Sequence, residues 1–358
     1  MKKRILSGLL AVFMLLCLIC LPISAETGSG STQLMGDFDN SGKVDNLDVE
    51  YLLWHTLFPE EYILNANGDI DNDQQVDNRD VEYLLWHTLF PESYPLPAKP
   101  AGEFKVYFID VGQADAALII CDGKTMLIDG GNAADSNLMY TFLKNKGVNH
   151  LDYVIGTHAH EDHIGGLTGA LNYAKADKVY CATTSYSTAA FRNFANAVKN
   201  QGKSITIPSV GTQFNLGSAT CTVLAVNTTS DVNNSSIVLR IVYGNTSFLF
   251  TGDAEKEVEQ SMINRGVTLK STVLKVGHHG SYTSSSYQFL RAVDADYAVI
   301  SCGKGNDYGH PHAQVLSRLK DADLKLFRTD LQGDILCTSD GKTVTFTVTR
   351  NENASVFQ

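Results

Sequence analysis

The sequence contains little cysteine and little positive charge, and each shortage excludes a class of protein. Only 7 of its 358 residues are cysteine, and the five beyond residue 25 form no C-x-x-C pair. An odd number of unpaired cysteines argues against a disulfide framework, so we expect these five to be small buried side chains. The chain has 28 Lys and Arg against 39 Asp and Glu, and it shows no basic stripe of the kind that marks many nucleic-acid-binding surfaces.

The first 25 residues differ from the ordinary soluble composition of the rest. Lys2, Lys3 and Arg4 precede an apolar run over residues 9–21, and the Ile-Ser-Ala sequence at 23–25 offers a cleavage position before Glu26. This order is typical of a secretory signal peptide. The apolar run is short for a retained membrane anchor. We therefore expect residues 1–25 to be removed, leaving a secreted, extracellular protein with no membrane anchor.

The negative charge is concentrated in one small region that contains an internal repeat. Residues 26–100 carry 15 Asp and Glu against 3 Lys and Arg, whereas residues 101–358 carry 24 against 22. The segment 44–60 recurs at 76–92 with a single change, Leu47 against Arg79. This is a 32-residue duplication. The remainder of the chain is close to neutral, which permits polyanionic substrates.

Each copy of the repeat contains carboxylates at the spacing of a calcium-binding loop. A hard cation needs several oxygen ligands, and a tight turn points alternate side chains inward. The first loop would use Asp37, Asp39, Ser41, Lys43, Asp45 and Asp48, and the second Asp69, Asp71, Asp73, Gln75, Asp77 and Asp80, with Lys43 and Gln75 giving backbone carbonyls. Gly42 suits the sharp turn of the first loop, but Gln74 takes its place in the second. We therefore expect two calcium ions, the second bound more weakly.

Each loop leads into a helix whose apolar stripe one copy cannot bury, so the two copies should pack as a pair. The arrangement over residues 36–94 resembles a dockerin, the duplicated calcium-binding module that attaches secreted enzymes to cohesin modules of a cellulosome-type scaffold protein. The resemblance implies a cohesin partner and contacts to it through Asn46, Leu47, Asn78 and Arg79. The proline-containing segment 95–103 is expected to be a semi-extended linker.

A second domain is expected over residues 104–350, and its most informative feature is a short loop rich in histidine. A strand predicted at 151–156 leads into His158, His160, Asp162 and His163. Imidazoles and carboxylates are preferred ligands of first-row divalent ions, and four on one loop exceed what a tetrahedral site usually takes from one segment. The loop therefore predicts two adjacent metal ions at the carboxyl end of a strand.

Strands alternate with helices along this domain, which indicates an α/β layered protein. The expected strands are 104–111, 116–121, 125–128, 153–156, 178–182, 220–225, 236–251, 272–277, 297–302 and 334–348. The expected helices lie near 137–146, 187–201, 255–265 and 313–320, with a further small-residue helix opened by Gly165 and Gly166.

Six motifs follow one another in the order of a known family. They lie at residues 108–116, 127–131, 157–163, 250–253, 275–281 and 309–312. Together they resemble the metallo-β-lactamase superfamily, and in particular the soluble domain of bacterial DNA-uptake channel proteins and the phosphorylcholine esterases. The resemblance implies an αββα sandwich, preceded here by a small all-α domain of duplicated calcium loop-helix units.

The resemblance also implies a ligand set. His158 and His160 would hold one metal, Asp162 and His163 the other, and Asp253 would bridge them. A further ligand should come from the pair His278 and His279. We favour His279 as the ligand and His278 as a supporting or proton-donating group, although the reverse assignment stays open.

Three other positions complete the expected site. Asp129 would orient the histidine loop, and either His278 or His312 would protonate a leaving group. His310 and His312 could contact phosphate or simply enter a helix. No histidine stands between residues 205 and 250 at the family's third motif, where residues 231–236 contain aspartate, asparagine and serine. The choice between zinc and manganese therefore stays open.

The expected reaction is hydrolysis, because two metals supply hydroxide from a bridging water at neutral pH. The leading hypothesis is a secreted, scaffold-attached phosphodiesterase or nuclease, with Asp162 in the catalytic set. One alternative is a carboxylic esterase or lactonase of the same fold that acts on plant cell-wall material. Another is a non-catalytic, calcium-dependent scaffold-binding module, although the intact ligand set argues against it.

Overall fold

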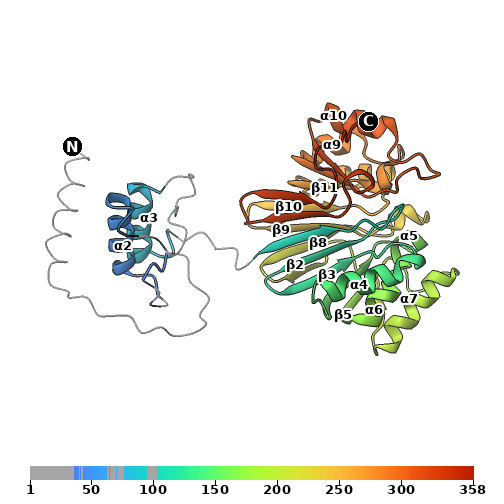
Figure 1. Cartoon of the computed structure of the whole chain (residues 1–358), viewed down its shortest axis with the longest axis horizontal. Coiled ribbons are helices and arrows are strands. Elements are labelled where there is room, and N and C mark those ends of the chain that lie inside the picture. Colours follow the sequence, from blue (N-terminus) through green and yellow to red (C-terminus); the bar gives the residue numbers. More distant parts are fainter. Residues whose placement is uncertain are drawn as a thin grey trace. The chain divides into compact units, whose positions relative to one another are not determined.

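The computed structural model describes residues 36–39, 41, 43–62, 64, 70, 76–94 and 103–358. The chain divides into two compact units, Met1–Pro97 and Ala98–Gln358 (Figure 1). Several predictions lie outside the described residues: the signal peptide over 1–25, the linker up to residue 102, and the second-loop positions Asp69, Asp71, Asp73 and Gln75.

In the described part of the first unit, the two copies of the repeat form two helices that share one apolar cluster. These are α2 (Asn46–Leu57) and α3 (Asn78–Leu89). Each begins with a capping box, made by Asp45 and Asp48 in α2 and by the equivalent pair of aspartates in α3. The buried cluster takes side chains from both copies: Phe38, Val49, Leu52, Ile70, Val81 and Leu84.

The second unit is a sandwich of two β-sheets (Figure 1). The eight-stranded sheet has the order β15 (Val344–Val348), β14 (Ile335–Ser339), β1 (Phe104–Phe108), β2 (Ala117–Cys121), β3 (Lys124–Ile128), β4 (His150–Gly156), β5 (Lys175–Cys181) and β6 (Ile205–Thr206). The seven-stranded sheet has the order β13 (Lys325–Arg328), β12 (Tyr297–Ile300), β11 (Val273–Lys275), β10 (Thr246–Phe250), β9 (Val238–Tyr243), β8 (Ala219–Ala225) and β7 (Gln213–Leu216).

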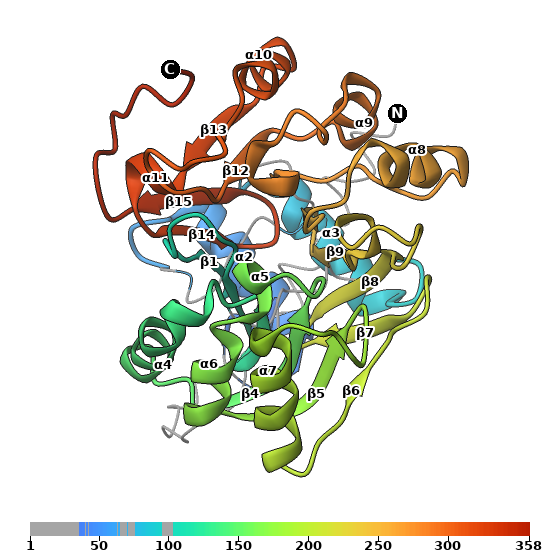
Figure 2. The same ribbon diagram turned by 90° about the vertical axis from the view of Figure 1, so that its right-hand side faces the viewer.

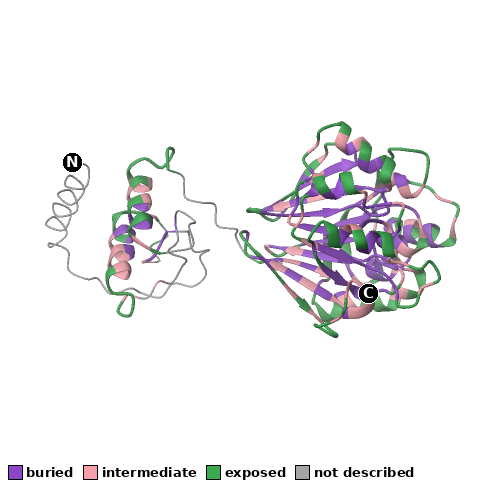
Figure 3. Cartoon of the chain, turned by 90° about the horizontal axis from the view of Figure 1, so that it is seen from above, coloured by how far each residue is buried: buried purple, intermediate pink, exposed green. Residues whose placement is uncertain are grey.

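Helices cover the outer faces of both sheets (Figure 2). Those packed with the first sheet are α4 (Ser136–Asn145), α6 (Leu167–Tyr173) and α7 (Ala189–Asn200), and those packed with the second are α8 (Lys256–Asn264), α9 (Tyr287–Val293) and α10 (Ala313–Asp321). Shorter elements are η2 (Ala133–Asp135), α5 (Glu161–Ile164), η3 (Asn233–Ser235), η4 (Gly277–Gly280) and α11 (Thr329–Gln332). One buried cluster lies between the sheets and one under each helical layer, as the burial colours show (Figure 3).

The predicted two-sheet α/β sandwich is confirmed, and the differences are local. The single strand expected over 236–251 is the hairpin β9–β10, which turns at Gly244 with φ +55°. The strand expected over 334–348 is likewise a hairpin, β14–β15. Three short strands, β6, β7 and β13, and helix α9 had no predicted counterpart. The five cysteines of the described chain are buried and unpaired, as predicted.

The topology brings several loops to one edge of the sandwich. In the first sheet β3 and β4 run parallel, and in the second β10, β11 and β12 run parallel. Loops that follow parallel strands emerge at the same edge, which is where α/β proteins commonly bind ligands. The segments that follow β4, β10 and β11 are the histidine loop, Asp253 and η4. None of the described helices is both long and apolar enough to span a bilayer.

Candidate metal centre

The carboxylate of Asp253 lies at the centre of the site, buried in the segment that follows β10. Its Oδ1 lies 3.2 Å from Nε2 of His163, and its Oδ2 lies 3.7 Å from Nε2 of His158. The two oxygens therefore face two different groups of side chains. Its backbone N–H donates to Oγ of Ser236 at 3.0 Å, which fixes the carboxylate from the loop before β9.

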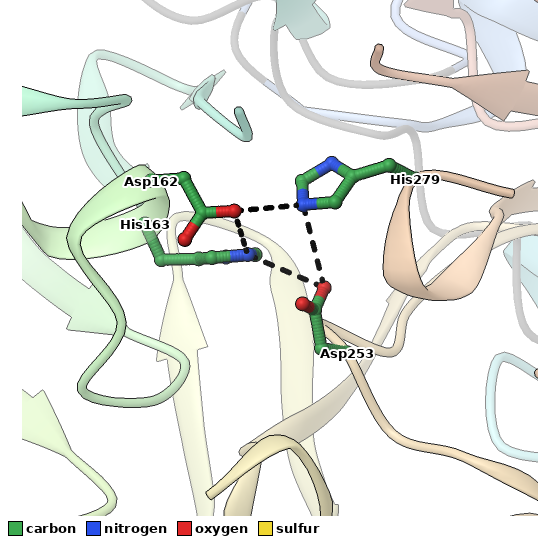
Figure 4. A group of neighbouring side chains, drawn as sticks. All are labelled: Asp162, His163, Asp253 and His279. Atoms are coloured by element: carbon green, nitrogen blue, oxygen red, sulfur yellow. Dashed lines mark hydrogen bonds and ion pairs between the residues drawn. The ribbon is translucent and has the colours of Figure 1, made fainter. Parts of the chain in front are cut away.

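The group beside Oδ1 contains Asp162, His163 and His279, whose ligand atoms and that of Asp253 lie within 4.8 Å of one another. Figure 4 shows the four side chains converging from the histidine loop, β10 and η4. Oδ2 of Asp162 lies 3.2 Å from Nε2 of His279 and 3.8 Å from Nε2 of His163. Two imidazoles and two carboxylates around one point are a ligand set for a divalent transition metal.

The group beside Oδ2 contains His158 and His160. Nε2 of His158 and Nδ1 of His160 are 3.0 Å apart, so both nitrogens point to one region. His158 is fully buried. Burial, followed by the neighbouring His163, holds the pKa of His158 well below its ordinary value. A neutral imidazole is the form that binds a metal.

The carboxylate of Asp129 fixes the histidine loop through two hydrogen bonds. Nδ1 of His163 donates to its Oδ2 at 2.8 Å, and the backbone N–H of Thr157 donates to its Oδ1 at 2.7 Å. Asp129 itself follows β3 with φ +56°, a conformation that aspartate tolerates better than most residues. Because Nδ1 of His163 carries the donated proton, a neutral ring keeps its Nε2 lone pair available to a cation on the side of Asp253.

A second buried network orients His279. Its Nδ1 lies 3.1 Å from the carbonyl oxygen of Ser301 and 3.6 Å from Oδ1 of Asp115. Asp115 pairs with Nζ of Lys275 at 2.8 Å, and both side chains are buried. Burial alone would raise the pKa of Asp115, but Lys275 and then His279 outweigh it and lower that pKa. His279 therefore also presents Nε2 to the ligand group.

These residues fit a pair of metal ions. Within the described chain, His163 Nε2 and Asp253 Oδ1 are buried atoms with no hydrogen-bond partner. Burial alone would lower the pKa of His279, but Asp253 and Asp115 raise it to about 10. The carboxylates thus create a strongly negative environment in which a cation is favoured. Buried acceptor atoms without a hydrogen-bond partner, in a region of excess negative charge, are typical of a metal site in which no ion is bound.

His278, the alternative ligand, occupies a different position from His279. Its Nε2 lies 3.7 Å from Oδ2 of Asp253, on the side of His158 and His160, and its Nδ1 lies 3.2 Å from Oε1 of Glu255. Both histidines have positive φ, 50° and 52°. This backbone turns consecutive side chains toward the two oxygens of one carboxylate.

A cavity of about 330 Å³ opens beside the two groups. The described residues that line it are Gln113, His160, Glu161, Asp162, Asn233, Asp253, His278, His279, Tyr308 and His310. Sequence reasoning missed Gln113 and Tyr308, although both lie in or beside the quoted motifs. Asn233 belongs to the segment that replaces the third-motif histidine, and its Oδ1 is buried without a hydrogen-bond partner among the described residues.

His312 begins helix α10 beside this cavity rather than among the residues that line it. Its Nδ1 accepts a hydrogen bond from the backbone N–H of Tyr282 at 3.1 Å, and its ring packs against the ring of His310 with centroids 4.8 Å apart. Of the two histidines in this motif, His310 therefore has the more direct access to a bound molecule.

The first calcium loop is partly described. Carboxylate oxygens of Asp37, Asp39 and Asp48 lie within 4.8 Å of one another. Asp48 Oδ1 also accepts the backbone N–H of Phe38 at 2.6 Å. Of the residues expected to contact cohesin, Leu47 is 55% exposed. The others make polar contacts: Asn46 with Thr88, Asn78 with Thr56, and Arg79 with Asp77.

The family follows from a direct comparison. A family model described as the metallo-beta-lactamase superfamily matches residues 109–304, which is more than half of the chain. The chain therefore belongs to this superfamily, whose members are generally metal-dependent hydrolases.

Among curated proteins, the chain is similar to ComE operon protein 3 of Bacillus subtilis, with 31% identity over 268 residues, 69% of this chain and 34% of the relative. It is also 32% identical over 238 residues to competence protein ComA of Neisseria gonorrhoeae, covering 66% of this chain and 32% of the relative. The chain thus spans about a third of the length of these relatives. A solved structure, the metallo-beta-lactamase fold protein YhfI of B. subtilis, aligns over 66% of this chain and 99% of its own, with 15% identity and a TM-score of 0.45.

Proposed function

We propose that this chain is a binuclear metal-dependent hydrolase of phosphodiester bonds, a phosphodiesterase or nuclease. The observation that carries the proposal is the position of Asp253, whose two oxygens face two separate ligand groups. His158 and His160 would hold one ion, and Asp162, His163 and His279 the other. Two bound divalent ions lower the pKa of water and neutralise charge on a phosphoryl oxygen.

The protein side chains then divide the remaining tasks. Asp129 fixes His163, and Asp115 fixes His279, each through the Nδ1 atom of the histidine ring. His278 lies on the cavity wall with Nδ1 beside Glu255, an arrangement that suits a group that delivers a proton to a leaving alkoxide. A neighbouring carboxylate holds a histidine ring in one orientation. The same carboxylate stabilises the positive charge that the ring carries before it transfers a proton.

The chemistry of the cavity wall favours a diester over a monoester. Three carboxylates line it, and no lysine or arginine is among its described lining residues. A phosphate monoester carries up to two negative charges and usually needs cationic side chains. A diester carries one negative charge, which two metal ions and neutral donors such as Gln113 can accommodate.

The first unit supplies the second part of the proposal. A dockerin-like module over residues 36–94 would bind two calcium ions and attach the enzyme to a cohesin on an extracellular scaffold. The duplicated sequence, the capping boxes of α2 and α3 and the carboxylates around Asp48 support this proposal. The signal-like residues 1–25 are consistent with secretion.

An activity screen tests the proposed reaction. The full chain is assayed with zinc and with manganese against bis-p-nitrophenyl phosphate, single-stranded DNA and p-nitrophenyl acetate. We expect metal-dependent cleavage of at least one phosphodiester, and its loss in the double variant His158→Ala plus His160→Ala. The exposed His150→Ala variant is the matched control and should retain activity. Turnover of the acetate ester alone would favour the esterase alternative, and undiminished activity in the double variant would refute the site.

A further inference from the structure

His310 is held on the cavity wall by its own loop, between β12 and α10. The side chain of Asn306 accepts the backbone N–H of His310 through Oδ1 at 3.0 Å and donates through Nδ2 to its carbonyl oxygen at 2.6 Å. The same Nδ2 donates to the carbonyl oxygen of Gly303 at 2.8 Å. The backbone N–H and the backbone carbonyl group of His310 are therefore both held by the side chain of Asn306.

The side chain of Gln113 comes from the opposite sheet and fixes the ring. The backbone N–H of Gly303 lies 3.0 Å from Oε1 of Gln113, and because a backbone N–H can only donate, the atom that faces it must be the carbonyl oxygen. The other end of the amide, Nε2, then lies 3.1 Å from Nδ1 of His310. An amide NH₂ can only donate, so Nδ1 of His310 is the acceptor.

The consequence for His310 is a defined tautomer. A neutral imidazole whose Nδ1 accepts a hydrogen bond carries its proton on Nε2. The same hydrogen bond requires a neutral ring, because an imidazolium carries a proton on both nitrogens and could not accept from Nε2 of Gln113. The ring therefore offers one N–H donor and lines the cavity.

Gly303 makes the approach of Gln113 possible. A Cβ added at residue 303 would lie 2.7 Å from the backbone nitrogen of Gln113 and 3.1 Å from its Cβ. Only glycine accommodates contacts this close between two backbones. The pairing thus depends on a close approach between a loop that follows β1 and a loop that follows β12.

We propose that Gln113 holds His310 in the Nε2–H tautomer so that this N–H donates a hydrogen bond to a non-bridging phosphoryl oxygen of the substrate. The ring centroid of His310 lies 5.7 Å from that of His278 and 6.2 Å from that of His279, so one phosphoryl group can reach all three rings. His310 thereby contacts the substrate without transferring a proton, and it adds a donor but no charge. The identity of the bound oxygen rests on the proposed phosphodiesterase function, whereas the tautomer does not.

The tautomer is tested first, independently of turnover. The full chain, loaded with zinc and labelled with ¹⁵N in histidine, is studied by long-range ¹H–¹⁵N correlation NMR, and the His310 signals are assigned by their loss in His310→Gln. We expect a protonated Nε2 and an unprotonated Nδ1 in the wild type. The Gln113→Leu variant, which removes the donor, should shift this ring toward the other tautomer. A wild-type ring protonated on Nδ1 would overturn the proposal.

The substrate contact is tested by kinetics on the same proteins. His310→Ala should lower kcat/KM for bis-p-nitrophenyl phosphate about 10- to 100-fold, the usual effect of losing one hydrogen bond to a charged group. It should weaken inhibition by dimethyl phosphate by a similar factor. His310→Gln, which retains a side-chain N–H, should recover part of both losses. The His150→Gln variant, altered at an exposed position, should match the wild type.

The metal content of the His310→Ala variant distinguishes two roles of His310: contact with the substrate, and support of the expected metal ligand His279. The transition metal bound per chain, measured by mass spectrometry, should be the same in His310→Ala and in the wild type. A loss of metal in this variant, or a loss of less than twofold in kcat/KM and in inhibition, would overturn the substrate contact. If the wild type hydrolyses p-nitrophenyl acetate but no phosphodiester, the proposed function fails, and the NMR result still decides the tautomer.

Discussion

Nδ1 of His163 donates a hydrogen bond to Oδ2 of Asp129 at 2.8 Å, and both side chains are fully or almost fully buried. This bond links the end of β3 to the ligand loop that follows β4. Asp129 also accepts the backbone N–H of Thr157, so one carboxylate sets both the path of the loop and the orientation of a ligand ring. Carboxylate support of this kind is common behind metal-binding histidines.

The Asp129→Asn variant should bind metal more weakly without unfolding. An asparagine keeps the size of the side chain but supplies only one acceptor, so it cannot hold both His163 and Thr157 in their present positions. We expect metal affinity to fall about 10- to 100-fold, measured by competition with a chromogenic chelator. The Asp177→Asn variant, at an exposed position, is the control. Unchanged affinity in Asp129→Asn would show that the bond does not orient a ligand.

The buried pair Lys275 and Asp115 should make a large contribution that depends on both partners. Lys275→Met leaves a buried carboxylate without its cation, which costs about 3–5 kcal/mol of unfolding free energy. The double variant Lys275→Met plus Asp115→Leu should recover much of that loss because neither member of the pair is left buried without its partner. Urea unfolding of the metal-free proteins measures both. Equal losses in the single and double variants would show that the two side chains do not stabilise the fold as a pair.

Asp115 also gives the protein a defined pH dependence. Its pKa in the folded state lies below its ordinary value because Lys275 and His279 outweigh burial. The unfolded chain therefore binds more protons as the pH falls below about 4. Stabilisation by Asp115 is present above that pH and is lost as the pH falls toward the folded pKa. The difference in unfolding free energy between wild type and Asp115→Asn should be larger at pH 7 than at pH 3.5.

Calcium should stabilise the first unit through the carboxylates of the first loop. A ligand that binds only the folded state raises the free energy of unfolding in proportion to the logarithm of its concentration above the dissociation constant. We expect calcium to raise the melting temperature of α2 and α3 relative to excess chelator, followed by circular dichroism of the full chain. Asp37→Ala should reduce this shift, and the exposed control Glu60→Gln should not. A calcium response that Asp37→Ala leaves intact would argue against this loop.

Much of the architecture was predictable because its signals are local. The histidine loop stands in seven consecutive residues, and the apolar strands that lead to it alternate clearly. The missed strands carry weaker signals, since Ile205–Thr206 has only two residues and Lys325–Arg328 has a charged residue at each end. The contact between Gln113 and His310 joins residues 197 positions apart. It depends on two loops from different sheets, and a single sequence contains no direct sign of it.

The two hairpins show the same limit at the level of secondary structure. The long apolar stretch over 236–251 was expected to be one strand, but Gly244 allows a tight turn with positive φ in its middle. The pattern of buried residues continues through both arms because each packs into the same sandwich core. Hydrophobicity alone therefore predicted the core and not the reversal of the chain.

Anomalous X-ray scattering from crystals of the zinc- or manganese-loaded chain will show whether Asp253 lies between two metal ions. We expect two anomalous peaks in the second unit. One should lie beside Oδ2 of Asp253 with His158 and His160, and the other beside Oδ1 with Asp162, His163 and His279. A single peak, or two peaks that do not share Asp253 as a ligand, would rule out a binuclear site centred on Asp253.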